Sequence, residues 1–267
     1  MSLRSSIKSL PTLMKVGFAE AVAYRAEMIV WVLATTMPLV MYQLWSAVSR
    51  VAPIGGYGKK DFLAYFLAAF IVRQLTGSWA AWQMNFEVRQ GTLAMKLLRP
   101  LHPLLTYATE NLSYLPMRLV IVAPVLTAMV ILVGPGYLPH TPLQVVIWFF
   151  GTVGGWGVIF LINLCIGCMA LFIKSTLKFM DAYLAMSFVF SGYLIPVELF
   201  PDRLRHLIDW LPFRYTIGLP IELFVTRHSD AEALSLLARQ WCWVAILFVT
   251  ATLLWRRGIS KFEAYGG

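Results

Sequence analysis

The chain is dominated by six continuous apolar runs, and most of them are long enough to cross a lipid bilayer. A helix needs about 20 apolar residues to span a hydrocarbon core of about 30 Å. Inside that core the backbone must bond to itself, which a single continuous run achieves only as a helix. We therefore predict an all-α integral membrane protein with six transmembrane helices. The runs cover residues 28–48, 62–83, 112–133, 143–173, 179–195 and 236–255.

The composition excludes a soluble fold of this size. Hydrophobic residues make up 59% of the 267 residues and charged residues only 13%, whereas a soluble domain carries about 25% charged residues. No polar segment between the runs is long enough to fold alone, so we expect one domain over 1–267. Its expected parts are an interfacial helix (1–26), the six-span bundle (27–255) and a cytoplasmic tail (256–267).

The first residues are amphipathic and too polar to span a membrane. Apolar side chains recur at helical spacing with Arg4, Lys8 and Lys15 between them, which predicts a helix lying on the inner leaflet. Pro11 is expected to break or bend this helix. The segment lacks the pattern of a secretory signal peptide, so we expect it to be retained on the cytoplasmic side.

Two polar residues fall at membrane depth. Arg73 lies near the centre of the second run, where a charge costs at least about 2.5 kcal/mol unless it faces protein or water. It could contact an anionic or polar substrate, or it could pair with a carboxylate or with helix-end carbonyls of a neighbouring span. Asn163 is the one amide of the fourth run.

The stretch 85–103 is the longest well-charged interruption between two apolar runs in the first half of the chain. Gly91 and Pro100 bracket a run of good helix formers, with Thr92 as a possible cap. This predicts a two-turn helix over 92–99 with one charged side and one apolar side, suited to a groove on another protein. The apolar edge consists of Leu93, Leu97 and Leu98, and the charged side chains are Glu87, Arg89, Lys96 and Arg99.

The segment 191–224 is not an ordinary loop, because it is apolar, aromatic and repeatedly interrupted by Gly and Pro. Such a backbone is tolerated at membrane depth only where it packs against protein. We therefore predict two short helices that enter the outer leaflet before the last span. The interrupting residues are Gly192, Pro196, Pro201, Pro212, Gly218 and Pro220.

The basic residues predict the orientation. Twelve Lys and Arg residues lie on the side of the N-terminus, the 85–103 stretch, the 174–178 turn and the tail, and seven lie on the other side. The positive-inside rule then places both termini in the cytoplasm. The net charge of +9 is accounted for in this way, so we expect membrane lipid and not nucleic acid as its partner.

No pattern of catalytic or metal-binding residues is present. The four histidines lie outside the apolar runs, and Cys165 and Cys168 lie among small membrane-helix residues where we expect them to pack. The sequence has no H-E-x-x-H, G-x-S-x-G or Walker motif. An intramembrane enzyme and a secondary transporter remain alternatives, although the latter would be expected to show internal repeats and several polar groups at the midplane.

In order and topology these features resemble the transmembrane subunits of ABC type-2 transporters. Two stretches carry the resemblance, the first around the predicted cytoplasmic helix and the second around the predicted re-entrant segment. The first comprises Glu87, Gly91, Thr92, Leu93, Leu97, Leu98, Arg99 and Pro100, and the second Gly192, Pro196, Pro201, Pro212 and Pro220. The ending with Gly258, Tyr265, Gly266 and Gly267 is similar to the tail of one bacterial subfamily of these permeases.

The resemblance implies that transport and ATP hydrolysis are carried out by different subunits. This chain would bind no cofactor and catalyse no reaction, while two copies of a separate ABC ATPase would bind ATP and Mg. It would pair with a second permease, identical or sibling, in the bacterial inner membrane, usually for export. The residues from Glu87 to Pro100 would form the coupling helix that contacts the ATPase. The first, second and fifth spans would line the path, near Arg73, Trp79, Trp82 and Asn163.

Overall fold

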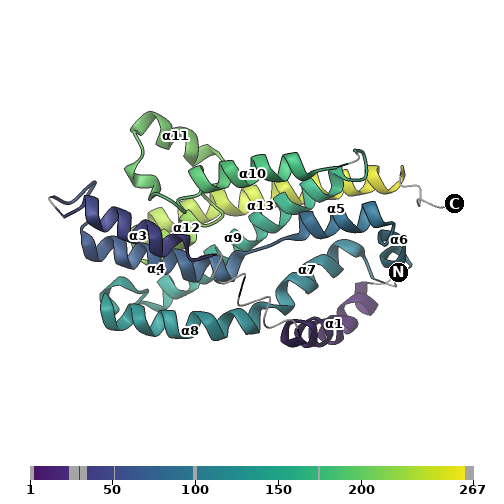
Figure 1. The fold of residues 1–267 in the computed structure, drawn as a ribbon, viewed down its shortest axis with the longest axis horizontal. Coiled ribbons are helices and arrows are strands. Elements are labelled where there is room, and N and C mark those ends of the chain that lie inside the picture. Colours follow the sequence, from purple (N-terminus) through teal and green to yellow (C-terminus); the bar gives the residue numbers. More distant parts are fainter. Residues whose placement is uncertain are drawn as a thin grey trace.

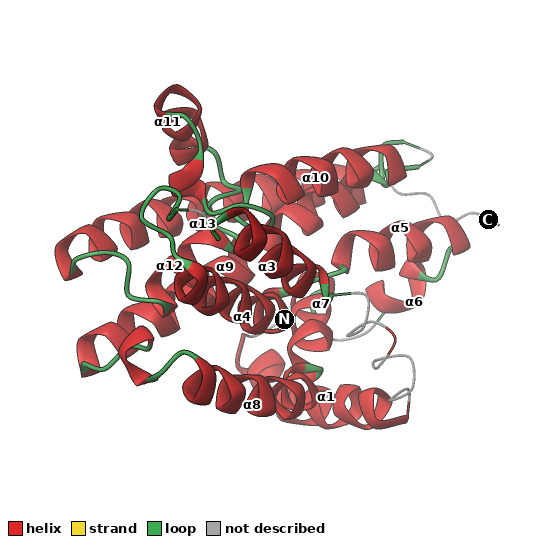
Figure 2. Ribbon diagram, turned by 60° about the vertical axis from the view of Figure 1, so that its left-hand side comes forward, coloured by secondary structure: helices red, strands yellow, loops and turns green. Residues whose placement is uncertain are grey.

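A computed structural model describes residues 3–23, 30, 35–50, 52–98, 101–173 and 175–261. Within these ranges every regular element is a helix, and no strand is formed beyond one isolated bridge between Ile54 and Tyr57. Figures 1 and 2 show the helices gathered into an elongated bundle. The prediction of an all-α protein is confirmed.

In the described part of the chain, four helical segments are long and apolar enough to cross a membrane. Two are single helices and two are interrupted. The predicted first and fifth spans contain only short helices, α3 (Met37–Val48) and α10 (Leu177–Phe190), and part of 28–48 lies outside the described residues. The four segments are α4 (Lys59–Thr76) with α5 (Ala80–Gln90), α7 (Pro103–Ser113) with α8 (Leu115–Leu132), α9 (Pro142–Met169) and α13 (Asp230–Ile259).

Helix α9 forms the centre of the bundle and contacts α4, α5, α13 and the short helix α12 (Gly218–Phe224). Glycines make this close packing possible. A Cβ on Gly155 would lie 2.6 Å from the carbonyl oxygen of Thr216, and one on Gly154 would lie 2.5 Å from Oε1 of Gln240. The glycines of the fourth run therefore serve close helix approach, and α9 is not broken at them.

Helix α1 (Leu3–Ala23) packs beside α7, where Gly17 lies against the side chain of Ser113. It continues through Pro11, so of the two effects expected there, a break or a bend, the break does not occur. Apolar side chains remain exposed along it, as an interfacial helix requires. They are Met14, Val16, Phe18 and Val22.

The two ends of the bundle differ. The short helix α6 (Leu93–Leu97) and the end of α13 lie at one end, and α11 (Asp202–Trp210) projects toward the other (Figure 1). The segment 191–224 thus contains two short helices, α11 and α12, preceded by a 3-10 turn at Val197–Leu199. Every residue of α12 is buried.

Candidate functional site

A left-handed glycine separates α5 from α6. Gly91 has φ +73°, and its N–H donates to the carbonyl of Val88. Glycine is the residue that ends helices in this conformation without steric cost. The observed helix α6 is shorter than the predicted 92–99, because Leu98 already forms its C-terminal cap, while Arg99 and Pro100 lie outside the described residues.

A buried ionic network fixes α6 to the bundle. The Lys96 ammonium lies 2.8 Å from Oε1 of Glu87 on α5 and 2.9 Å from Oε2 of Glu110 on α7. The hydroxyl of Tyr107 donates to Oε2 of Glu87 at 2.5 Å, and the ammonium stands over the Tyr107 ring. Gln83 donates to Glu110 at 2.6 Å. One lysine therefore holds three helices together.

This network changes the roles expected for the coupling residues. Glu87 and Leu93 point into the bundle, and Leu93 is fully buried. Thr92 was predicted to cap α6. Its hydroxyl instead donates to the carbonyl of Glu87 and makes no capping hydrogen bond. Among the described residues of α6 and its caps, the exposed side chains other than Thr92 are apolar: Leu98 is 82% exposed, Met95 66%, and Leu97 is also exposed.

The second candidate span is interrupted at membrane depth. Helix α4 ends at Thr76 and α5 begins at Ala80, so Gly77, Ser78 and Trp79 are not helical. Buried Arg118 of α8 compensates by donating to the carbonyls of Gln74 (3.1 Å) and Gly77 (3.0 Å). The predicted second span, 62–83, lies within the candidate span Lys59–Gln90, but its helix is interrupted at 77–79. No role was predicted for Arg118 from the sequence.

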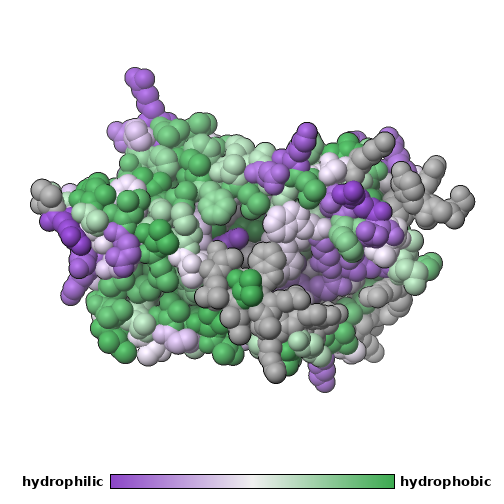
Figure 3. All heavy atoms as spheres, viewed as in Figure 1, coloured by the Kyte–Doolittle hydropathy of each residue, from purple (hydrophilic) through white to green (hydrophobic). Residues whose placement is uncertain are grey.

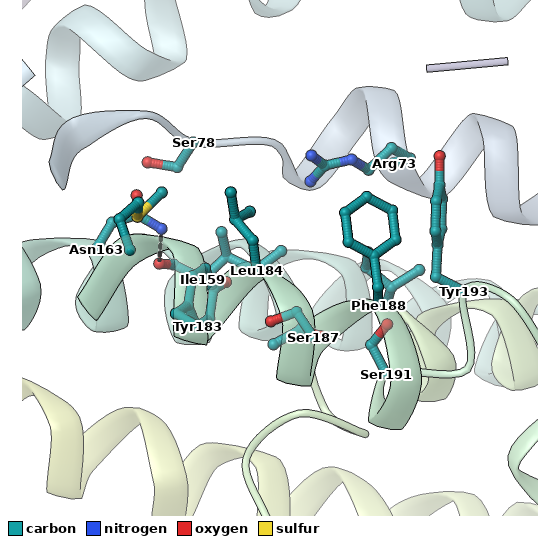
Figure 4. Close-up of a pocket in the computed structure, with 13 residues that line it drawn as sticks. Arg73, Ser78, Ile159, Asn163, Tyr183, Leu184, Ser187, Phe188, Ser191 and Tyr193 are labelled. Atoms are coloured by element: carbon teal, nitrogen blue, oxygen red, sulfur yellow. Dashed lines mark hydrogen bonds between the residues drawn. The ribbon is translucent and has the colours of Figure 1, made fainter. Parts of the chain in front are cut away.

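A pocket lies beside this interruption, between the α4–α5 segment on one side and α9 and α10 on the other (Figure 4). Its space amounts to about 470 Å³, the open side included. Arg73 enters it from α4 and Asn163 from α9. The other polar side chains on its wall are Ser78, Tyr183, Ser187, Ser191, Tyr193 and Thr216.

Of the four residues predicted to lie near a path, the pocket brings together two. Arg73 and Asn163 both line it, but the Asn163 amide is used by the protein, since it donates to Ile159 and accepts from the N–H of Ala81. Trp79 instead lies under the Arg118 guanidinium and edge-on to Tyr114. Trp82 lines a separate hollow at the surface with Arg89.

The segment 191–224 is tied to the bundle by special backbone positions. Gly192 has φ +81°, and its carbonyl accepts a hydrogen bond of 2.7 Å from Tyr65 of α4. Pro220 packs against Gly155 of α9. The other prolines stand at helix starts or turns: Pro196 before the 3-10 turn, Pro201 before α11, and Pro212 between α11 and α12.

A second buried network holds α12 in place. Arg214 forms ion pairs with Asp209 of α11 and, at 2.8 Å, with Glu222 of α12. Nε2 of His228 lies 2.9 Å from the same Glu222, and its Nδ1 lies 3.1 Å from Glu232. Because both imidazole nitrogens face carboxylates, the protonated ring is the form that satisfies this site.

The stability of the protein is expected to fall as the pH rises above about 6.5, the ordinary pKa of histidine. Burial lowers the pKa of His228, but the hydrogen bond and charge of Glu222, together with Glu232, outweigh it and raise the pKa. A raised pKa gives stability that is complete below the unfolded-state pKa and is lost as the pH rises through the folded-state pKa. Thermal unfolding midpoints in detergent between pH 6 and pH 9 measure this loss of stability.

The matched variants are His228→Gln and His206→Gln, the latter at an exposed histidine of α11. Only His228→Gln is expected to flatten the pH dependence. An unchanged slope in that variant would assign the titration to another group.

Residues 32–266 match the family model described as "ABC-2 family transporter protein". No curated protein matches the sequence. The matched range includes the ionic network around α6, the interrupted span, the pocket and the segment 191–224.

Proposed function

Because this chain belongs to the ABC-2 family of transporter proteins, we propose that it is the permease subunit of an ATP-driven ABC transporter and works as an exporter in the bacterial inner membrane. A separate ABC ATPase, present in two copies, binds ATP and Mg and hydrolyses the nucleotide. A second permease, identical or sibling, completes the path. Family membership favours this function over an intramembrane enzyme or an ion-coupled secondary transporter.

The observation that carries the proposal is which side chains α6 buries and which it exposes. Its polar side chain Lys96 faces inward to Glu87 and Glu110, while Met95 and Leu98 face outward. This reverses the usual arrangement of a short surface helix, in which charges face water and apolar groups face the core. Exposed apolar side chains on a firmly held helix are suited to insertion into an apolar groove of the ATPase.

The same contacts provide a route for mechanical coupling. A displacement of α6 acts through Lys96 on α5 and α7 together. Helix α5 leads to the non-helical residues 77–79, beyond which α4 is held by Arg118 at its last carbonyls. We infer that α5 turns against α4 at this interruption and alters the pocket beside it.

We also propose the number of spans and the side of the membrane on which each segment lies. The domain comprises 1–267 with six spans, of which α3 and α10 belong to the first and fifth. Helix α1 lies on the inner leaflet, both termini are cytoplasmic, and the α11–α12 segment is extracellular. The end of α13 lies at the same end of the molecule as α6, which agrees with this orientation (Figure 1).

Replacing Leu98 with Asp, alone or with Met95→Asp, is expected to reduce the recovery of the ATPase with the tagged permease at least about tenfold. A carboxylate buried in an apolar groove without a partner costs several kcal/mol, and 1.4 kcal/mol corresponds to a factor of ten in affinity. Co-purification from the native host in mild detergent, with mass spectrometry and an orthovanadate-sensitive ATPase assay, measures the effect.

The matched control is Trp210→Asp, which introduces the same charge at a 78% exposed apolar residue of α11 toward the other end of the molecule. It should leave ATPase recovery unchanged. If Leu98→Asp retained the ATPase, α6 would not be the contact. A wild-type chain that purified alone without hydrolysis in several detergents would refute the proposed function.

A further inference from the structure

Arg73 is a cation without a counter-ion in the described part of the chain. It lies near the middle of the Lys59–Gln90 segment, and there it forms no ion pair or hydrogen bond with any described residue. Among the described residues that line the pocket it enters, none is a carboxylate. A charge at this depth is costly unless it is compensated, so an anion that enters the pocket would be bound strongly.

The second polar feature of the pocket is a row of hydroxyl groups. Tyr183, Ser187 and Ser191 recur every four residues along one face of α10 and its end, and all three line the pocket. Ser191 is fully buried, and its Oγ has no hydrogen-bond partner within the described residues. In Figure 4 the guanidinium of Arg73 lies on the opposite side of the pocket from Ser187 and Ser191.

The wall also has an apolar part. Leu184 and Phe188 of α10 and Ile217 before α12 lie beside the hydroxyl groups. Figure 3 shows a small hydrophilic patch in a hollow near the middle of the face in view, with apolar side chains above it. A ligand that satisfies this pocket therefore has a polar, charged part and an apolar part.

We propose that this pocket binds an amphiphile with an anionic oxyacid headgroup, such as a phosphate ester carrying a hydrocarbon chain. The headgroup accepts hydrogen bonds from Arg73 and Ser191, because a guanidinium presents several donors that match the oxygens of an oxyacid. The hydrocarbon lies along Leu184 and Phe188. This inference deepens the proposed function, on which it rests, by naming the chemical class of its substrate.

Binding of fluorescent phosphatidylglycerol to the purified permease complex in nanodiscs of phosphatidylcholine tests the proposal. Phosphatidylcholine with the same fluorescent chain is the zwitterionic reference, and inorganic phosphate is the soluble competitor. We expect the anionic lipid to bind at least about tenfold more tightly than the reference. Equal binding of the two lipids would overturn the proposal. Full competition by millimolar phosphate would also overturn the proposal, because the ligand would then be a soluble anion and not an amphiphile.

Variants connect this selectivity to the pocket. Arg73→Gln is expected to reduce binding of the anionic lipid to the level of the zwitterionic one, Arg73→Lys to retain part of the preference, and Ser191→Ala to weaken anionic binding about threefold. Arg203→Gln, at an exposed arginine of α11, should have no effect. A preference that survives Arg73→Gln in folded protein would place the anion elsewhere.

The binding assay and the ATPase assay can contradict this inference and the proposed function separately. A permease that recovers its ATPase but shows no anionic preference retains the proposed function and loses this inference. A permease that binds the anionic lipid through Arg73 but has no ATPase loses the proposed function and retains the binding site. Monodisperse elution and an unchanged thermal midpoint verify that Arg73→Gln is folded.

Discussion

Exchanging Glu87 for lysine is expected to abolish ATP-driven turnover of the complex while leaving the permease in the membrane. The variant would place two ammonium groups where the native protein holds an ion pair of 2.8 Å, and it would remove the acceptor of the Tyr107 hydroxyl. Removing one partner of a buried ion pair costs about 3–5 kcal/mol. That cost is relieved when α6 detaches from α5 and α7, which separates the ATPase contact from the spans.

Permease-dependent, orthovanadate-sensitive hydrolysis by the purified complex measures this effect, with a loss of at least about tenfold expected. Glu87→Gln retains an acceptor for Tyr107 and lacks the repulsion, so it should be intermediate. Asp230→Lys reverses an exposed carboxylate in the first turn of α13 and should be nearly silent. Wild-type turnover in Glu87→Lys would remove the network from the coupling route.

Replacing Arg118 with leucine is expected to produce the largest loss of stability. Two buried carbonyls at the interruption, those of Gln74 and Gly77, would lose a charged donor. Each such bond contributes about 1.5–3 kcal/mol, so the loss is expected to be about 3 kcal/mol or more. For a protein of this size that corresponds to a decrease in the thermal midpoint of roughly 6–12 °C.

Thermal unfolding in detergent, followed by tryptophan fluorescence, measures the change. Both bonds come from Nη1 of Arg118. Arg118→Lys retains the charge as a compact ammonium without the planar guanidinium, so its midpoint should lie between those of the wild type and Arg118→Leu. Arg203→Leu removes an exposed arginine and should leave the midpoint unchanged. An unaltered midpoint in Arg118→Leu would mean that another group satisfies these carbonyls.

The features that were predictable from the sequence are those that depend on neighbouring residues. Long apolar runs and Gly91 determine where α9, α13 and the turn before α6 occur, because length and glycine conformation act locally. The short helices of 191–224 follow from their Pro and Gly punctuation in the same way. The count of six spans stays a prediction, because α3 and α10 are short in the described structure.

The features that were not predictable depend on contacts between distant segments. The interruption at 77–79 is stable because Arg118 reaches it from another helix, although the Gly77–Ser78 pair and the arginine in the third apolar run were visible signals. Likewise, Glu87 and Leu93 were expected to face a partner. They face inward because Glu110 and Tyr107 of α7 supply the partners of this network.

On the proposed function, the location of Arg73 would also make transport sensitive to the electrical potential of the membrane. A charge that moves across the full bilayer changes energy by about 2.3 kcal/mol per 100 mV, and Arg73 lies near the middle of its segment. With the pocket empty, this force would act on the uncompensated charge of Arg73 wherever α4 moves along the membrane normal. An anion bound as proposed would offset that charge, so voltage would act less on the step that carries the ligand than on the return of the empty transporter.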